Sequence, residues 1–136
     1  MSVYVDSSAL LKIYFREADF TACLKLLKKD TDWISGRHTE VEVRRNLALG
    51  LKGKDYAKAR DQFSRDWAAV KKVTLTKAVC ESAAEIAERT GVRTLDALHL
   101  GAADQAGGGL LPFITYDVRQ SKAANFLGWT VWGTKA

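Results

Sequence analysis

The sequence is poor in the residues that bind soft metals or form cross-links: its 136 residues include two cysteines and two histidines. Cys23 and Cys80 are far apart in the chain and lack the close spacing of metal-binding cysteines. We therefore expect two free thiols, as is usual for a protein in a reducing cytoplasm.

The sequence also lacks the segments that mark membrane, secreted or multidomain proteins. It has no apolar run long enough to span a membrane. Asp6 interrupts the short apolar start, and no basic stretch precedes it, so we expect no signal peptide. We find no internal repeat, low-complexity tract or linker. A chain of 136 residues suits one domain, residues 1–136.

Positive charge is concentrated in the first half of the chain. Residues 1–72 hold 15 basic and 10 acidic side chains, whereas residues 73–136 hold 6 of each. This asymmetry hints at a polyanionic partner such as RNA, although a solvated helix face explains each basic residue equally well. The candidate phosphate contacts are Arg44, Arg45, Lys52 and Lys54.

Short apolar strands alternate with helices along the whole chain. We expect strands at residues 2–5, 33–35, 73–75, 112–116 and 130–132. We expect helices at residues 7–15, 19–29, 39–50, 55–71, 77–91, 95–106 and 118–128. This alternation is typical of a parallel sheet with helices on both faces. The sequence therefore predicts the α/β class, as a three-layer α/β/α sandwich with a central parallel sheet.

Four acidic residues, Asp6, Glu42, Asp96 and Asp117, each lie at or just inside the start of a predicted helix. Taken singly, each is explained by helix capping or by the helix dipole, and Glu42 has capping-box spacing with Thr39. Taken together, acids along one sheet edge would converge and repel, and a divalent cation would offset the repulsion. Oxygen ligands without a histidine or cysteine set favour Mg²⁺ or Mn²⁺ over zinc.

The choice of glutamate stays open at this point. Residues two apart on a helix point about 200° apart, so only one of Glu40 and Glu42 can face a given site. Glu40 lies nearer the apolar side that Val43 and Leu47 form, so helix geometry alone does not choose between the two.

Four stretches resemble, in order, the motifs of PIN domains, and most closely those of VapC-type toxins from bacterial and archaeal toxin–antitoxin pairs. They are YVDSSAL at residues 4–10, TEVEVRRNL at 39–47, TLDALHL at 94–100 and FITYD at 113–117. The resemblance covers nearly the whole chain. One departure is Val118, which stands where the family often has a basic residue, and this puts one substrate contact in doubt.

The resemblance implies the toxin of a type II toxin–antitoxin pair. Its activity would be that of a metal-dependent endoribonuclease, cleaving RNA with metal-activated water and leaving 5′-phosphate and 3′-hydroxyl ends. It implies Mg²⁺ or Mn²⁺ as cofactor, a homodimer, a cognate VapB-type antitoxin and no membrane association. The implied catalytic residues are Asp6, Glu42, Asp96 and Asp117, of which Asp6, Asp96 and Asp117 hold metal, with Ser7 and Thr115 in supporting positions.

Two other interpretations stay open. A phosphatase of the haloacid dehalogenase type needs D-x-D-x-T, and Ser8 stands where its second aspartate belongs. A catalytically silent PIN-fold module would bind RNA or protein without cleaving it. Neither histidine is expected to act in catalysis: we expect His99 to be a partly buried structural residue and His38 a loop residue.

Overall fold

A five-stranded parallel sheet lies at the centre of the computed structural model, which describes residues 2–29 and 32–134. Its strands are β1 (Ser2–Val5), β2 (Asp32–Gly36), β3 (Lys71–Val73), β4 (Phe113–Thr115) and β5 (Val131–Gly133). Their order across the sheet is β3-β2-β1-β4-β5. The chain runs outward from β1 to β3 and then returns to the other side of β1 with β4. The strand order therefore reverses between β1 and β4.

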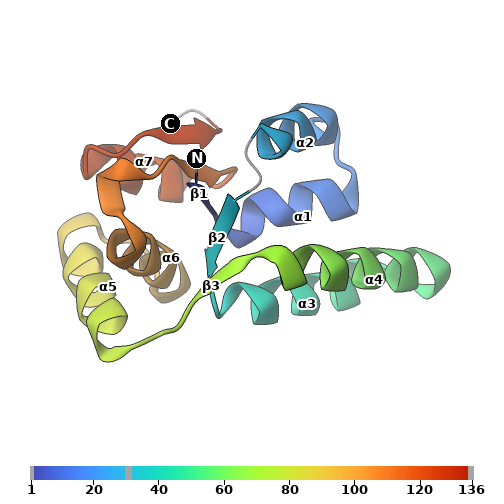
Figure 1. Cartoon of the computed structure of the whole chain (residues 1–136), viewed down its shortest axis with the longest axis horizontal. Helices are drawn as coiled ribbons and strands as arrows, with labels where there is room; N and C mark the ends of the chain where they lie inside the picture. The colour runs from blue at the N-terminus through green and yellow to red at the C-terminus, as the bar shows by residue number, and fades with distance from the viewer. Residues whose placement is uncertain (1, 30–31, 135–136) are drawn as a thin grey trace.

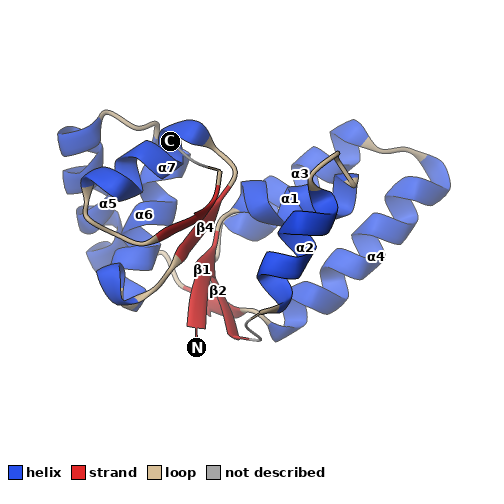
Figure 2. Cartoon of the chain, turned by 90° about the horizontal axis from the view of Figure 1, so that it is seen from above, coloured by secondary structure: helices blue, strands red, loops and turns tan. Residues whose placement is uncertain are grey.

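Helices cover both faces of this sheet (Figure 1). One layer contains α1 (Ser7–Phe15), α2 (Phe20–Lys28), α3 (Thr39–Gly50) and α4 (Gly53–Ala69). The other contains α5 (Lys77–Thr90), α6 (Thr94–Ala106) and α7 (Val118–Phe126), with a short 3₁₀ turn at Gly108–Leu110. Figure 2 shows the two helical layers on opposite sides of the strands. The predicted three-layer α/β/α sandwich is confirmed.

The alternation of side chains along β1 explains why there are two cores. Val3 and Val5 point into a core shared with α1, α2, α3 and α4. Tyr4, between them, points into the core on the α5–α7 side, where its ring stacks on Phe113 with 5.1 Å between centroids. Successive strand residues face opposite sides, so Val3, Tyr4 and Val5 of β1 anchor both helical layers.

The third strand and the helix before it differ from the prediction. The helix ends at Ala69, and the strand covers Lys71–Val73 rather than residues 73–75. Two adjacent lysines look unlike a buried strand in sequence. β3 is, however, an edge strand, where lysine is common because one side of the strand stays open to water.

Two further predictions from the sequence concern the state of the cysteines and membrane-spanning segments. Cys23 is buried and Cys80 is exposed, and both are free thiols. None of the described helices is both long and apolar enough to cross a membrane.

Candidate active site at the carboxyl edge of the sheet

Four acidic side chains from four different elements line one pocket of about 610 Å³, the acidic pocket. Asp6 follows β1 and Asp117 lies just beyond β4, on either side of the point where strand order reverses. Glu42 and Asp96 lie in the first turns of α3 and α6. This edge is where open α/β sheets bind ligands.

Asp6 is held by its own helix and is almost fully buried. Its Oδ1 accepts the backbone N–H of Ala9 at 3.1 Å, which caps α1, and the hydroxyl of Ser8 at 2.6 Å. The side chain is 2% exposed, and this burial raises the pKa of Asp6, although the charge of His99 and the hydrogen bonds oppose the rise. Ionising a carboxyl group in this buried position costs free energy unless a cation lies nearby.

Ser8 connects the ends of β1 and β4. Besides donating to Asp6, its hydroxyl accepts the backbone N–H of Tyr116 at 2.9 Å and lies 3.3 Å from the hydroxyl of Thr115. Sequence reasoning placed the supporting serine at Ser7, whose hydroxyl lies 3.4 Å from Nε2 of His99. The missed signal is the Asp-x-Ser spacing, which lets a hydroxyl reach back to the capping carboxylate.

Thr115 and Asp117 form the second junction. The Oγ1 atom of Thr115 accepts the backbone N–H of Asp117 at 3.0 Å. The Oδ1 atom of Asp117 accepts the backbone N–H of Gln120 at 3.1 Å and so caps α7. Thr115 thus has the contacts of a supporting residue, and Asp117 is both a helix cap and part of the pocket wall.

Asp96 has an unsatisfied oxygen. Its Oδ2 atom is buried without a hydrogen-bond partner, and Nε of Arg93 lies 3.6 Å away. Burial raises the pKa of Asp96, and the charges of Asp117 and Asp6 raise it further. A buried carboxylate oxygen without a hydrogen-bond partner, beside two other carboxylates, fits a hard divalent cation with oxygen ligands.

A chain of hydrogen bonds that begins on β1 orients the Glu42 side chain in the acidic pocket. The hydroxyl of Tyr4 accepts the backbone N–H of Gly36 at 2.9 Å, so its own proton is free for Nδ1 of His99, 2.8 Å away. The remaining proton on Nε2 is then donated to Oε1 of Glu42 at 2.7 Å. Burial raises the pKa of Glu42, but the hydrogen bond and charge of His99 outweigh it, and the net shift is downward.

The capping box predicted for α3 is wrong. The Oγ1 atom of Thr39 lies 2.7 Å from the hydroxyl of Ser35 on β2 instead of capping the helix. The residue at the N-cap position is His38, whose side chain makes no capping bond. Glu42 is therefore free of a capping role and turns toward His99.

The structure separates the two glutamates of α3. Glu40 accepts a hydrogen bond from Nε1 of Trp67 at 3.2 Å and pairs with Arg44 at 3.3 Å, on the side of α4. Glu42 lines the acidic pocket, and Glu40 does not. The open choice is thus decided geometrically in favour of Glu42.

Both histidines lie in the kind of position that the sequence predicts, but each makes a contact that was not predicted. His99 is 2% exposed, as expected of a structural residue, but it also contacts Glu42. His38 lies in the turn before α3, as expected of a loop residue, but it is 8% exposed, and its ring centroid lies 4.2 Å from that of His99. Sequence reasoning missed both because the two residues are far apart in the chain.

The predicted RNA-contacting residues lie outside the pocket lining. Arg44, Arg45, Lys52 and Lys54 are exposed on α3 and around the α3–α4 turn. Arg93, which was not predicted, lines the pocket together with Asn46. The four predicted basic side chains thus lie around the acidic pocket, whereas Arg93 contacts Asp96 directly.

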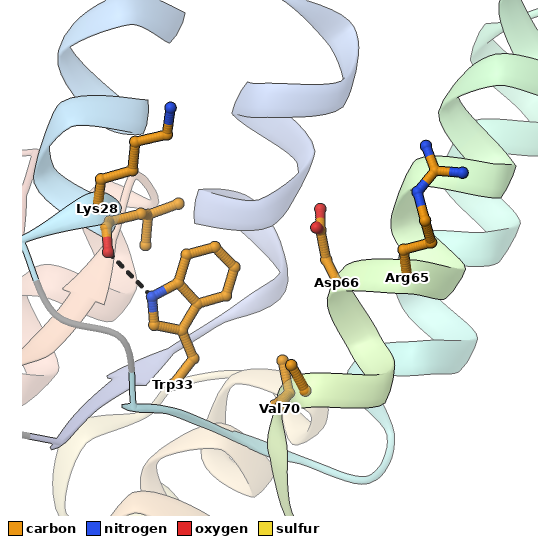
Figure 3. Close-up of a pocket in the computed structure, with 7 residues that line it drawn as sticks. Lys28, Trp33, Arg65, Asp66 and Val70 are labelled. Carbon is orange, nitrogen blue, oxygen red and sulfur yellow. Dashed lines mark hydrogen bonds between the residues drawn. The ribbon is translucent and has the colours of Figure 1, made fainter.

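A second pocket, of about 270 Å³, lies between α2 and α4 (Figure 3). Trp33 forms its floor and donates its indole N–H to the carbonyl of Leu27 at 3.0 Å. Asp66 and Arg65 reach it from α4. This pocket shares no lining residue with the acidic pocket among the described residues, so the converging acids lie elsewhere.

Comparison with known proteins agrees with this geometry. The family model described as PIN domain matches residues 3–125. The chain is 34% identical over 130 residues to ribonuclease VapC46 of Mycobacterium tuberculosis, covering 96% of this chain and 95% of that protein. It is 33% identical over 138 residues to ribonuclease VapC35 of the same species, covering 95% and 94%.

Solved structures show the same fold. FitAcB from Neisseria gonorrhoeae has a TM-score of 0.75 at 19% identity, covering 98% of this chain and 97% of that one. VapBC2 from Rickettsia felis, bound to a DNA fragment from its promoter, has a TM-score of 0.69 at 12% identity, covering 97% and 98%. With the family model and the VapC relatives, these likenesses establish that the chain belongs to the PIN domain family and, within it, to the VapC-type members.

Proposed function

We propose that this chain, as one domain over residues 1–136, is the toxin of a type II toxin–antitoxin pair and a metal-dependent endoribonuclease. The observation that carries the proposal is the convergence of Asp6, Glu42, Asp96 and Asp117 on one pocket where the strand order reverses. Relatives named ribonuclease VapC support the choice of RNA as the substrate.

The metal would be held by Asp6, Asp96 and Asp117. These three offer hard oxygen ligands. Burial raises the pKa values of Asp6 and Asp96, the charges of Asp117 and Asp6 raise that of Asp96 further, and a cation would offset both effects. Mg²⁺ or Mn²⁺ suits such ligands, and when bound it activates water and neutralises phosphate charge.

The other residues of the pocket position these acids. Ser8 holds Asp6 in one orientation, and Thr115 fixes the backbone at Asp117. Glu42, ionised because its pKa is lowered, is held by His99 and orients the attacking water or binds a second ion. Arg93 lines the pocket at the entrance of α6, where its charge faces an incoming phosphate.

RNA would continue from the pocket over the basic surface of the first half of the chain. Arg45 lies three residues after Glu42, and residues three apart share a helix face, so Arg45 is on the pocket side of α3. Arg44 is paired with Glu40 on another side. We therefore place Arg45 nearer the RNA than Arg44, with Lys52 and Lys54 extending the same surface.

The names of the solved neighbours support the proposed protein partners. The solved neighbours from Rickettsia felis and Neisseria gonorrhoeae are a VapBC2 structure and a FitAcB structure. By analogy, a VapB-type antitoxin would cover the acidic pocket of this chain, and the toxin would pair as a homodimer. Two free thiols are compatible with action in the cytoplasm.

Cleavage of total RNA by the purified protein tests the activity. We expect cleavage with Mg²⁺ or Mn²⁺, loss of cleavage with EDTA, and loss in Asp6→Asn and Asp96→Asn. Asparagine keeps the shape at Asp6 and the hydrogen bond from Ala9, so a folding defect is not expected.

The chemical ends of the RNA products distinguish between the possible cleavage mechanisms. Hydrolysis by activated water leaves 5′-phosphate and 3′-hydroxyl ends, and a 2′,3′-cyclic phosphate would contradict it. Wild-type protein that binds metal and RNA but cuts no RNA would instead identify the silent PIN-fold module. Cleavage that survives both asparagine substitutions would remove the acidic pocket from the mechanism.

A further inference from the structure

The most compact set of potential metal ligands in the described residues is not the four acids. It consists of His38, Glu42 and His99, whose ligand atoms all lie within 4.8 Å of one another. Nε2 of His99 and Nε2 of His38 lie 2.7 Å and 3.7 Å from Oε1 of Glu42. Two imidazoles and one carboxylate are the ligand set of many zinc sites, with a fourth position left for water.

His38 is the independent observation that points to a ligand. Its side chain is 8% exposed, and neither Nδ1 nor Nε2 has a hydrogen-bond partner within normal limits. Nε2 of His38 lies 3.7 Å from Oε1 of Glu42, so the ring is aimed at a carboxylate. A buried imidazole in this position offers a lone pair to a metal ion.

The surroundings also suit such a site. His99 is oriented by the hydroxyl of Tyr4 on Nδ1, the type of outer contact that fixes metal-binding histidines. The Tyr4 hydroxyl both donates and accepts, so it serves equally when Nδ1 carries the proton and Nε2 is free for metal. Glu42 and His99 line the acidic pocket, which gives an ion its path of entry.

We propose that His38, Glu42 and His99 form a second binding site, selective for Zn²⁺ or a similar imidazole-binding ion, beside the acidic pocket. Mg²⁺ does not compete there because it prefers oxygen ligands and retains its water. An ion in this site takes Glu42 away from the acidic pocket. Zinc therefore inhibits the Mg²⁺-dependent ribonuclease, a consequence that rests on the function proposed above, whereas the binding itself does not.

Zinc binding to the metal-free full chain is the primary test, measured by competition with a chromophoric zinc chelator. His38→Gln removes a ligand that lies outside the acidic pocket, and Asp117→Asn is the matched control because it alters the acidic pocket while keeping the cap of α7. We expect one tight zinc ion in wild type and Asp117→Asn. We expect at least about tenfold weaker binding in His38→Gln, since even outer-shell changes weaken metal sites by about 10- to 100-fold.

Zinc X-ray absorption on the wild-type complex supplies a second readout that does not depend on variants. Two imidazole ligands are expected, and their absence overturns the proposal. So does unchanged zinc affinity in His38→Gln that has a normal circular dichroism spectrum, or an equal loss in Asp117→Asn, which would locate zinc at the acids.

Inhibition is measured separately with RNA and Mg²⁺. His38→Gln keeps its Mg²⁺-dependent cleavage, and about tenfold more zinc is needed to inhibit it than wild type. Equal zinc sensitivity overturns the inhibitory role. If wild type cuts no RNA at all, the ribonuclease proposal fails, while the binding measurements still decide the zinc site.

Discussion

Glu42 and His99 are 57 positions apart in the sequence and are joined by a 2.7 Å contact between Oε1 and Nε2. The contact ties α3 to α6, and the bond from Tyr4 to the other ring nitrogen ties both helices to β1. The position of one carboxylate at the edge of the acidic pocket therefore depends on a chain of contacts that joins α3, α6 and β1. Its orientation depends on a hydroxyl group buried in the sheet.

Tyr4→Phe removes that hydroxyl and leaves two buried polar groups, Nδ1 of His99 and the N–H of Gly36, without a partner. We expect a loss of about 1–3 kcal/mol in the free energy of unfolding, measured with urea, and several-fold slower cleavage. Tyr14→Phe is the control. It breaks a partly buried bond to Asp66, which keeps a second bond from Gln62, so its loss is expected to be smaller. Equal losses would contradict the special role of Tyr4.

The two glutamates of α3 offer a matched pair. Glu42→Gln removes a charge from the acidic pocket and is expected to lower kcat for RNA cleavage by about 100-fold or more. Glu40→Gln keeps an acceptor for Trp67 and is expected to leave kcat unchanged. Single-turnover cleavage at saturating Mn²⁺ makes the comparison. Comparable losses in both variants would count against the placement of Glu42 alone in the site.

Asp6 destabilises the metal-free fold at neutral pH. Burial raises its pKa, so the folded state holds this proton more tightly than the unfolded chain. Its contribution is most favourable below the unfolded pKa and declines as pH rises through the higher folded pKa. Asp6→Asn is therefore expected to raise the unfolding free energy at pH 7, by about 1.4 kcal/mol for each pKa unit, and to make little difference in acid.

Thermal unfolding with and without metal completes this prediction. Mg²⁺ or Mn²⁺ is expected to raise the Tm of wild type, because an ion that binds only the folded state stabilises it, and to raise the Tm of Asp6→Asn much less. Millimolar metal without any effect on wild type would mean that the acids do not form one ion site.

Arg44 and Arg45 are neighbours in sequence with different surroundings. Neutralising a phosphate contact reduces the salt dependence of RNA affinity by about one unit of slope. We expect this reduction in Arg45→Gln and a much smaller one in Arg44→Gln, because Arg44 is already paired with Glu40. Binding would be measured over a range of KCl with catalytically inactive Asp96→Asn protein as background. Identical slopes for the two variants would refute the proposed RNA path.

Local sequence patterns were enough to predict most of the helices and strands. Buried β1 is apolar at every position that touches a core, and strong helix starts such as Thr76 and Asp117 made their boundaries readable. β3 was predicted at residues 73–75 rather than at Lys71–Val73, because Lys71 and Lys72 suit an edge strand, and edge position is a property of the sheet rather than of the segment.

The four acids and Thr115 could be predicted for the same reason, whereas the contacts of Ser8 and His99 could not. Each acid starts a helix, which is a local feature, and parallel strands bring such starts together. The roles of Ser8 and His99 depend on contacts to Tyr116 and Tyr4, which are distant in the chain. Thr39 is the opposite case, in which a local pattern predicts a contact that the folded chain does not make. Its spacing to Glu42 is right for a capping box, but a buried hydroxyl on Ser35 is its partner.

The return of the chain to the middle of the sheet has a consequence for synthesis. β1 is made first, yet its neighbour β4 begins at Phe113, close to the end of the chain. A ribosome that stops before this strand releases a product that contains Asp6, Glu42 and Asp96 but lacks both Asp117 and the strand that pairs with β1. We therefore expect incomplete translation products to lack the proposed ribonuclease activity, which needs Asp117 and hence nearly the whole chain.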